Sequence, residues 1–101
     1  MSILAIFSSN EITQEVYEAL RKEIGWETNQ PPGAMFHAAG LDDSGHVHVA
    51  DVWESAEALK AFVDYRLLPT LQRLHIAPPS VQIYPAFNIN AFPAVEKFVL
   101  R

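Results

Sequence analysis

The sequence contains no cysteine. This absence excludes a disulfide framework, a thiolate metal site and a cysteine nucleophile. It also fits a reducing compartment, so we expect the protein to be cytoplasmic. The sequence has no apolar run of about 20 residues, the length that a membrane span requires, and its first residues lack the basic segment of a signal peptide. We therefore expect no membrane partner.

Basic residues are also few. Seven Lys and Arg stand against twelve Asp and Glu, which gives a net charge of −5. A nucleic-acid-binding domain carries a basic stripe, and the scattered basic residues form none, so we expect no nucleic-acid partner. The sequence also lacks a G-x-G-x-x-G turn, a Walker loop, an H-E-x-x-H helix and a nucleophile elbow. We therefore expect no nucleotide cofactor, and we assign neither a cofactor nor a metal.

The 101 residues, half of them apolar, predict one globular domain. An apolar run at residues 3–8 predicts a first strand. The helix that follows has Thr13 as its N-cap and Gly25 as its C-terminal stop, because a hydroxyl accepts from free N–H groups and glycine adopts positive φ. An apolar stripe along this helix predicts that one of its sides is buried.

A β-hairpin is predicted at the centre of the chain, with strands at Ala34–Leu41 and His46–Trp53 around the turn at residues 42–45. Ser55 then caps a second helix. Pro69 predicts that this helix ends or kinks near Leu68, because proline lacks an N–H and clashes with the carbonyl of the preceding turn. A last strand is expected at residues 81–87, and a short helix in the tail.

The predicted order is β-α-β-β-α-β, followed by a tail. This order is typical of the ferredoxin-like α+β fold, in which two helices cover one face of a four-stranded antiparallel sheet. We assign residues 1–90 to this domain and residues 91–101 to the C-terminal tail.

The uncovered face of the sheet should be polar if it meets water, but both faces of the hairpin are largely apolar. If the hairpin loop has four residues, residues 42–45, then His37 lies opposite Ala50 and Ala39 lies opposite His48. This register places His37 and His48 on the same face. An apolar open face marks an interaction surface. We therefore predict a homodimer through the open sheet face.

Four residues are candidates for chemistry or for a pocket: His37, Asp51, Trp53 and Tyr84. His37 is a candidate base or, with His48, the beginning of a metal site; the alternative is that both histidines line the dimer interface. Asp51 is a candidate base or the partner of a cation, for which Arg66 is the candidate. Trp53 is either a core residue or the wall of a pocket for an aromatic ligand, with Tyr84 as a further member.

The stretch Gly33-Ala34-Met35-Phe36-His37-Ala38-Ala39-Gly40, the later Asp51-Val52-Trp53-Glu54-Ser55 and the helix with Phe62 resemble the dimeric α+β barrel superfamily. Within it, the sequence is similar to small proteins akin to antibiotic-biosynthesis monooxygenases. The resemblance covers roughly residues 2–90 and implies a dimeric α+β barrel. Trp53 matches a pocket tryptophan of the oxygenase-like and heme-degrading members.

The resemblance implies a small monooxygenase-like protein, and as an enzyme a cofactor-independent oxygenase or a related isomerase that acts on a small aromatic compound. The alternative is a homodimer that binds a small molecule without catalysis or is purely structural. The heme-degrading members place a ligand histidine ten residues after the matching tryptophan. Val63 occupies that position here, which argues against heme. A cavity beside Trp53 large enough for a ring compound would support the enzyme and the binding protein, whereas a filled core there would leave only the structural dimer.

Overall fold

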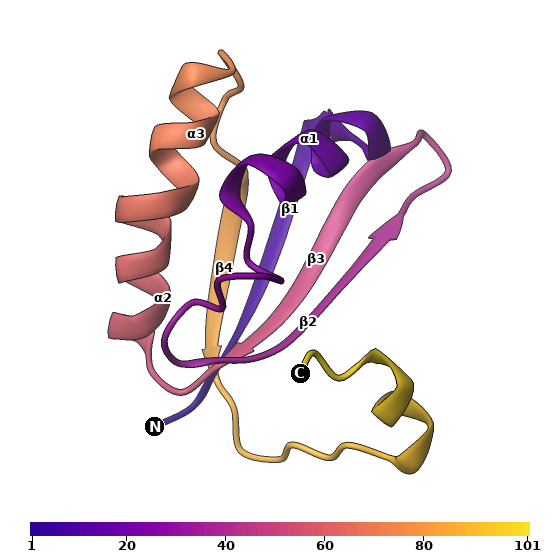
Figure 1. The fold of residues 1–101 in the computed structure, drawn as a ribbon, viewed down its shortest axis with the longest axis vertical. Coiled ribbons are helices and arrows are strands. Elements are labelled where there is room, and N and C mark those ends of the chain that lie inside the picture. Colours follow the sequence, from indigo (N-terminus) through magenta and orange to yellow (C-terminus); the bar gives the residue numbers. More distant parts are fainter.

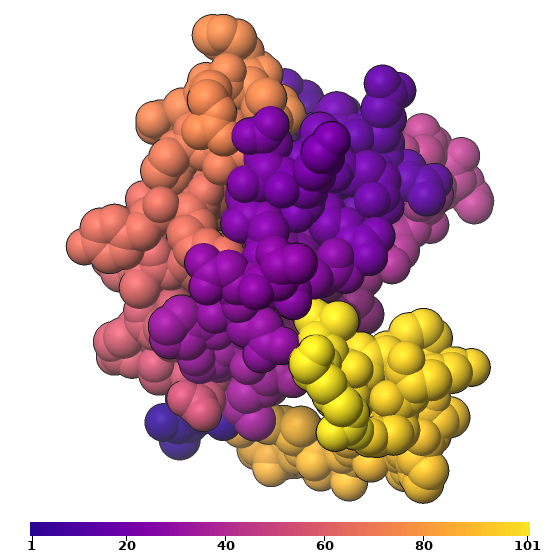
Figure 2. Space-filling view, viewed as in Figure 1, coloured from indigo at the N-terminus to yellow at the C-terminus, as the bar shows by residue number.

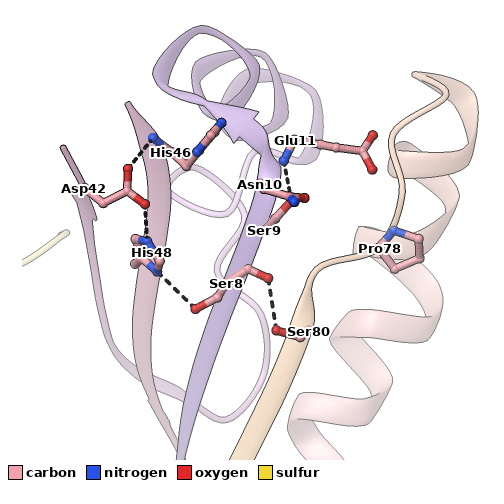
Figure 3. A pocket seen from close by; sticks show the side chains of 9 residues that line it. All are labelled: Ser8, Ser9, Asn10, Glu11, Asp42, His46, His48, Pro78 and Ser80. Carbon is pink, nitrogen blue, oxygen red and sulfur yellow. Dashed lines mark hydrogen bonds and ion pairs between the residues drawn. The ribbon is translucent and has the colours of Figure 1, made fainter. Parts of the chain in front are cut away.

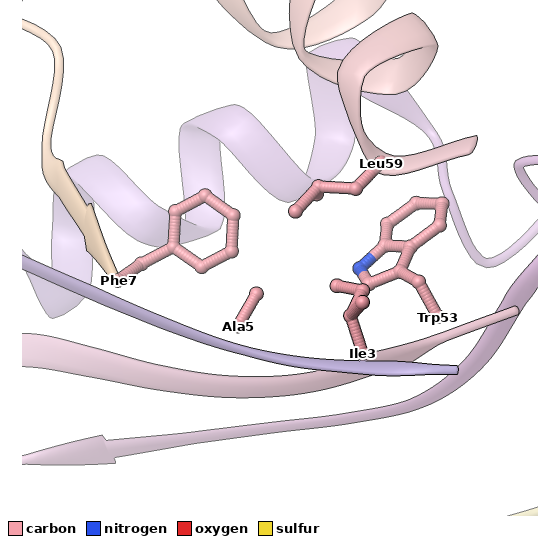
Figure 4. Packing of buried hydrophobic residues seen from close by; sticks show 5 residues of the cluster. All are labelled: Ile3, Ala5, Phe7, Trp53 and Leu59. Atoms are coloured by element: carbon pink, nitrogen blue, oxygen red, sulfur yellow. The ribbon is translucent and has the colours of Figure 1, made fainter. Parts of the chain in front are cut away.

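The computed structural model describes all residues 1–101 and has a four-stranded antiparallel sheet (Figure 1). Its helices pack on one face of this sheet, as Figure 4 also shows from close by. The predicted ferredoxin-like α+β fold is therefore confirmed. In the order β2-β3-β1-β4 across the sheet, the strands are β2 (Ala34–Leu41), β3 (His46–Trp53), β1 (Ile3–Thr13) and β4 (Ser80–Pro85).

The first helix, α1 (Gln14–Ile24), has the predicted caps. The Thr13 hydroxyl accepts a hydrogen bond from the Val16 N–H at 3.3 Å, and Gly25 takes the left-handed conformation with a φ of 68°. Strand β1 is longer than predicted, because its pairing with β3 resumes at Thr13 after an irregularity that follows Ser8. The predicted end of the first strand at residue 8 is therefore wrong.

The hairpin strands β2 and β3 have the predicted bounds, but the predicted register is wrong by one residue. The Asp42 N–H donates to the His46 carbonyl at 3.0 Å, so the loop has three residues instead of four. Gly45 supports this turn with a φ of 79°, as in a type I turn followed by a bulge. His37 consequently lies opposite Asp51. Because neighbouring side chains of a strand point to opposite faces, this shift moves the β2 side chains from Phe36 to Leu41 to the other face, whereas Ala34, beyond an irregularity in the strand, keeps the predicted pairing with Trp53.

The second helical region continues past Pro69. It consists of α2 (Ala56–Phe62), the π-helical segment Val63–Leu67 and α3 (Leu68–Arg73). The Ser55 hydroxyl caps α2 as predicted, accepting from the Ala58 N–H at 3.1 Å. Within the π segment the hydrogen bonds reach five residues back, which widens the turn just before the proline. Near Leu68, where a kink or an end was predicted, the helix changes type and continues to Arg73.

Strand β4 spans Ser80–Pro85, one residue earlier at its start and two residues shorter at its end than the predicted 81–87. It ends at a proline, which has no N–H with which to extend the ladder. The tail contains a short 3₁₀ helix at Pro93–Phe98, so the short helix predicted there is confirmed. No helix of the structure combines the length and apolar character needed to cross a membrane.

The core fills the space between the sheet and the helices (Figure 4). Alternate residues of β1 point into it, and Trp53 from β3 and Leu59 from α2 close it from the sides. The buried residues of this cluster are Ile3, Ala5, Phe7, Trp53 and Leu59. The face of the sheet away from the helices carries the other alternate residues, and we call it the open face.

Replacement of Gly33 by alanine should destabilise the protein by about 1–3 kcal/mol. Gly33 has a φ of +85°, and a Cβ atom there would lie 2.6 Å from the Ala58 Cβ. The Gly40→Ala variant is the matched control, because nothing lies within 4 Å of its added Cβ. Urea denaturation should separate the two variants; equal stabilities would contradict this account of Gly33.

Candidate functional site

A chain of hydrogen bonds joins three of the predicted site residues on the helix-covered face of the sheet. His37 Nδ1 lies 2.7 Å from Asp51 Oδ1, and Trp53 Nε1 donates to Asp51 Oδ2 at 3.1 Å. His37 and Asp51 are cross-strand partners, and Trp53 shares the face of Asp51 because it lies two residues further along β3. The sequence identified these residues one by one but did not predict that they touch.

Two aromatic residues that were not among the predicted site residues complete this cluster. The Tyr17 hydroxyl, from the first turns of α1, lies 2.7 Å from His37 Nε2. The Tyr17 and His37 rings are nearly parallel, and the Trp26 ring centroid lies 5.4 Å from that of His37. We call these five residues the His37 site. One sequence signal pointed to Tyr17. It lies four residues after the N-cap Thr13, and a side chain at that position packs against the residue before the cap, here Ile12, and so toward the core.

The hydrogen bonds define which nitrogen of His37 carries a proton. A carboxylate oxygen accepts, so Nδ1 donates to Asp51, and in the neutral imidazole Nε2 then accepts the hydroxyl proton of Tyr17. Burial raises the pKa of Tyr17 to about 12, which keeps its phenol protonated at neutral pH. The site therefore sets a basic ring nitrogen, oriented by a carboxylate, against a neutral phenol.

Arg66 is not the partner of Asp51, and that prediction is wrong. Its guanidinium donates to the carbonyls of Ile24 and Asn29 at 3.0 and 2.7 Å, and it lies over the Phe62 ring. Arg66 thus binds the carbonyl at the end of α1, where a cation is favourable. Asp51, which is 5 % exposed, instead accepts hydrogen bonds from His37 on β2 and from Trp53, two residues further along β3.

Trp53 is packed as a core residue in this structure. It is 3 % exposed, and its ring lies 5.3 Å from that of Phe62, with Leu59 in the same cluster. Tyr84 does not join the His37 site: it pairs with Leu4, on the open face, and its hydroxyl donates to Gln82. The His37 side chain is 35 % exposed, so the site is partly accessible to solvent.

His48 lies on the opposite face from His37, in a polar hollow of about 410 Å³ at one end of the sheet (Figure 3). Its ring bridges Ser8 and Asp42, with hydrogen bonds of 3.0 and 2.8 Å. The backbone N–H of His46, the His48 ring and the N–H of Ser44 hold the pKa of Asp42 down, at about 2. The predicted pair of His37 and His48 on one face is therefore wrong, and no group of three or more His, Asp or Glu side chains is placed to hold a metal ion.

Comparisons with known proteins identify the fold. No family model matches the sequence, and no curated protein matches it significantly. Solved structures do match. An antibiotic-biosynthesis-monooxygenase-like protein of Chloroflexus aurantiacus has a TM-score of 0.64 at 16% identity, covering 90% of this chain and 98% of its own. A second such protein, from Deinococcus radiodurans, has a TM-score of 0.57 at 19% identity over 91% and 98%.

A third match is SnoaB of Streptomyces nogalater, a cofactor-independent oxygenase, with a TM-score of 0.58 at 15% identity over 87% of this chain and 93% of its own. This chain has their fold. The predicted resemblance to antibiotic-biosynthesis-monooxygenase-like proteins is thereby confirmed at the level of structure. At these identities the similarity concerns the fold, so an activity has to be argued from this chain's own residues.

Removal of the Asp51 carboxylate should destabilise the fold strongly. The Asp51→Ala variant leaves the His37 and Trp53 N–H groups without an acceptor, and an unsatisfied buried donor costs about 1–3 kcal/mol. Thermal and urea unfolding should therefore show a loss of that size or more. The exposed Asp43→Ala variant is the control and should stay within about 0.5 kcal/mol of the parent protein. Equal losses in the two variants would contradict the role given to Asp51.

Proposed function

We propose that the protein oxidises a small hydroxylated aromatic compound without a cofactor, with His37 as the general base. The observation that carries this proposal is the chain Asp51–His37–Tyr17, which presents an oriented ring nitrogen to a phenol. The fold shared with the cofactor-independent oxygenase SnoaB supports the same reaction class.

Three residues around His37 assist it as a base. Asp51 fixes the tautomer of His37 and stabilises the imidazolium that forms when Nε2 takes a proton. Tyr17 acts as a proton relay. Its hydroxyl proton moves to His37 Nε2 while the Tyr17 oxygen accepts the hydroxyl proton of the substrate. The Tyr17, Trp26 and His37 rings pack against one another, with centroids 5.4 to 6.1 Å apart, and in this proposal their outer surfaces contact the aromatic substrate.

The electrons for the reaction come from the substrate. Loss of the hydroxyl proton gives an aromatic anion, which donates electrons to dioxygen more readily than the neutral compound does. At a CH₂ carbon of the substrate, one oxygen atom replaces both hydrogens as a carbonyl, and the second oxygen leaves with those hydrogens as water. The carbon loses four electrons and dioxygen gains four, so no further reductant is needed.

Oxygen uptake in the presence of a panel of polycyclic phenols that carry a ring CH₂ group tests this proposal. The His37→Gln variant should lower the rate by about 10²–10⁴-fold, the contribution of a positioned base. The His46→Gln variant is the control, because this histidine lies near the hairpin turn, away from the His37 site. Absence of oxygen uptake across the panel, or an unchanged rate in His37→Gln, would sink the proposal.

The second candidate function is that of a homodimer that binds a small molecule without catalysis or is purely structural, and a separate observation favours the dimer. The open face is apolar over much of its area, with alternate residues of β1 and β3 and two edge-strand side chains contributing: Leu4, Ile6, Phe36, Ala50, Val52 and Tyr84. Contiguous apolar patches are rare on monomers. We propose that two copies pack these faces together, at the usual spacing of about 10 Å between sheets.

Sedimentation equilibrium tests the dimer. The parent protein should be dimeric at micromolar concentration, and the Phe36→Glu variant should raise the dimer dissociation constant at least 100-fold by placing a charge on the open face. Leu41→Glu is the matched control, because Leu41 is similarly exposed on the same strand but points to the other face. A monomeric parent protein, or equal effects of the two charges, would contradict this interface.

A further inference from the structure

The last fifteen residues, 87–101, leave the body of the protein, and we call them the C-terminal arm. In Figures 1 and 2 the arm runs from the end of β4 to a lobe at one side of the molecule. The last hydrogen bond to the body is made by the Ala86 N–H, which donates to the Ser2 carbonyl at 3.0 Å. Every hydrogen bond and ion pair of the arm is internal to it.

The arm is apolar, unlike a solvated tail. Phe87, Phe92 and Phe98 are 100 %, 72 % and 70 % exposed, and they are three of the six phenylalanines in the chain. Segments that remain disordered are poor in aromatic residues, whereas this one is enriched in them. The arm also has a defined backbone, with a 3₁₀ helix at Pro93–Phe98 and a hydrogen bond from the Val95 N–H to the Phe92 carbonyl.

We propose that the C-terminal arm packs on a second copy of this chain, at the rim of the open face. This inference rests on the proposed homodimer and extends it. The arm is continuous with the proposed interface. Tyr84, on the open face, lies three residues before Phe87, so the arm starts where the proposed interface ends. Two copies that bring their open faces together therefore also bring each arm next to the partner.

The area of the arm fits this role. Aromatic side chains bury about 150–250 Å² each, so the three exposed phenylalanines offer roughly 400 Å² per arm. Two arms contribute roughly 800 Å², about half of the ~1,600 Å² that a standard stable interface buries. The arms would thus supply a large share of the dimer's contact surface.

The first test replaces the three phenylalanines by serine in the full-length chain, as Phe87→Ser, Phe92→Ser and Phe98→Ser together. Sedimentation equilibrium should show a dimer dissociation constant at least 100-fold higher than that of the parent protein. Tyr65→Ser is the control, because Tyr65 is an 81 % exposed aromatic on the helical layer and should leave dimerisation unchanged. An unchanged dimer in the triple variant overturns the role of the arm while the homodimer stands; a monomeric parent protein overturns both.

The second test locates the arm. Because the protein has no cysteine, an Ala94→Cys variant takes a single spin label. In mixed dimers of spin-labelled chains and ¹⁵N-labelled, cysteine-free chains, amides around the open face of the ¹⁵N chain should broaden. Sharp amides in the ¹⁵N chain of these mixed dimers, together with broadened body amides in a chain that carries both the spin label and ¹⁵N, would show that the arm packs on its own body and would overturn the proposal.

Discussion

The buried carboxylate of Asp51 is the constraint around which the hairpin and its surroundings are arranged. A charge that is almost fully removed from water needs strong donors, since its desolvation otherwise costs several kcal/mol. His37 on the neighbouring strand and Trp53 on its own strand supply them. Any other register would separate Asp51 from His37, so this polar contact favours the observed pairing of β2 with β3.

The same contact connects the core to the proposed chemistry. By holding Nδ1, Asp51 directs the other nitrogen of His37 toward Tyr17, at the partly exposed edge of the helix-covered layer. Trp53, in contrast, is enclosed by side chains of the core. The core beside Trp53 is filled, so the pocket expected there is absent and Trp53 itself supports only the structural dimer. The oriented base at His37 is a separate observation, and it favours catalysis. The reactive part of the proposed site is thus the histidine and tyrosine.

The sheet divides the molecule into two surfaces with different tasks. One face holds the helices, the core and the His37 site. The other face is apolar at one end and polar at the end where His48 bridges Ser8 and Asp42. Together with the C-terminal arm, this second face leaves apolar surface that the single chain does not cover, which is the physical reason for proposing a partner.

Local signals were sufficient for most of the secondary structure. The caps at Thr13, Gly25 and Ser55 were predictable because each depends on one side chain or one φ angle close in sequence. The bounds of both hairpin strands and the order of the elements followed from the same kind of local pattern, and that order is sufficient to indicate the ferredoxin-like fold.

Register and contacts across the sheet depended on information that local patterns do not carry. A turn ending in Gly45 closes with either three or four residues, and because both faces of the hairpin are apolar, the hydrophobic pattern favours neither register. The tertiary structure decided it, and with it the separation of His37 from His48. Tyr17 and Asp51 meet at His37 from distant parts of the sequence, and Arg66 finds backbone carbonyls instead of a carboxylate. The sequence thus determined three members of the site, His37, Asp51 and Trp53, while long-range packing brought them together, added Tyr17 and Trp26 and left Tyr84 on the other face.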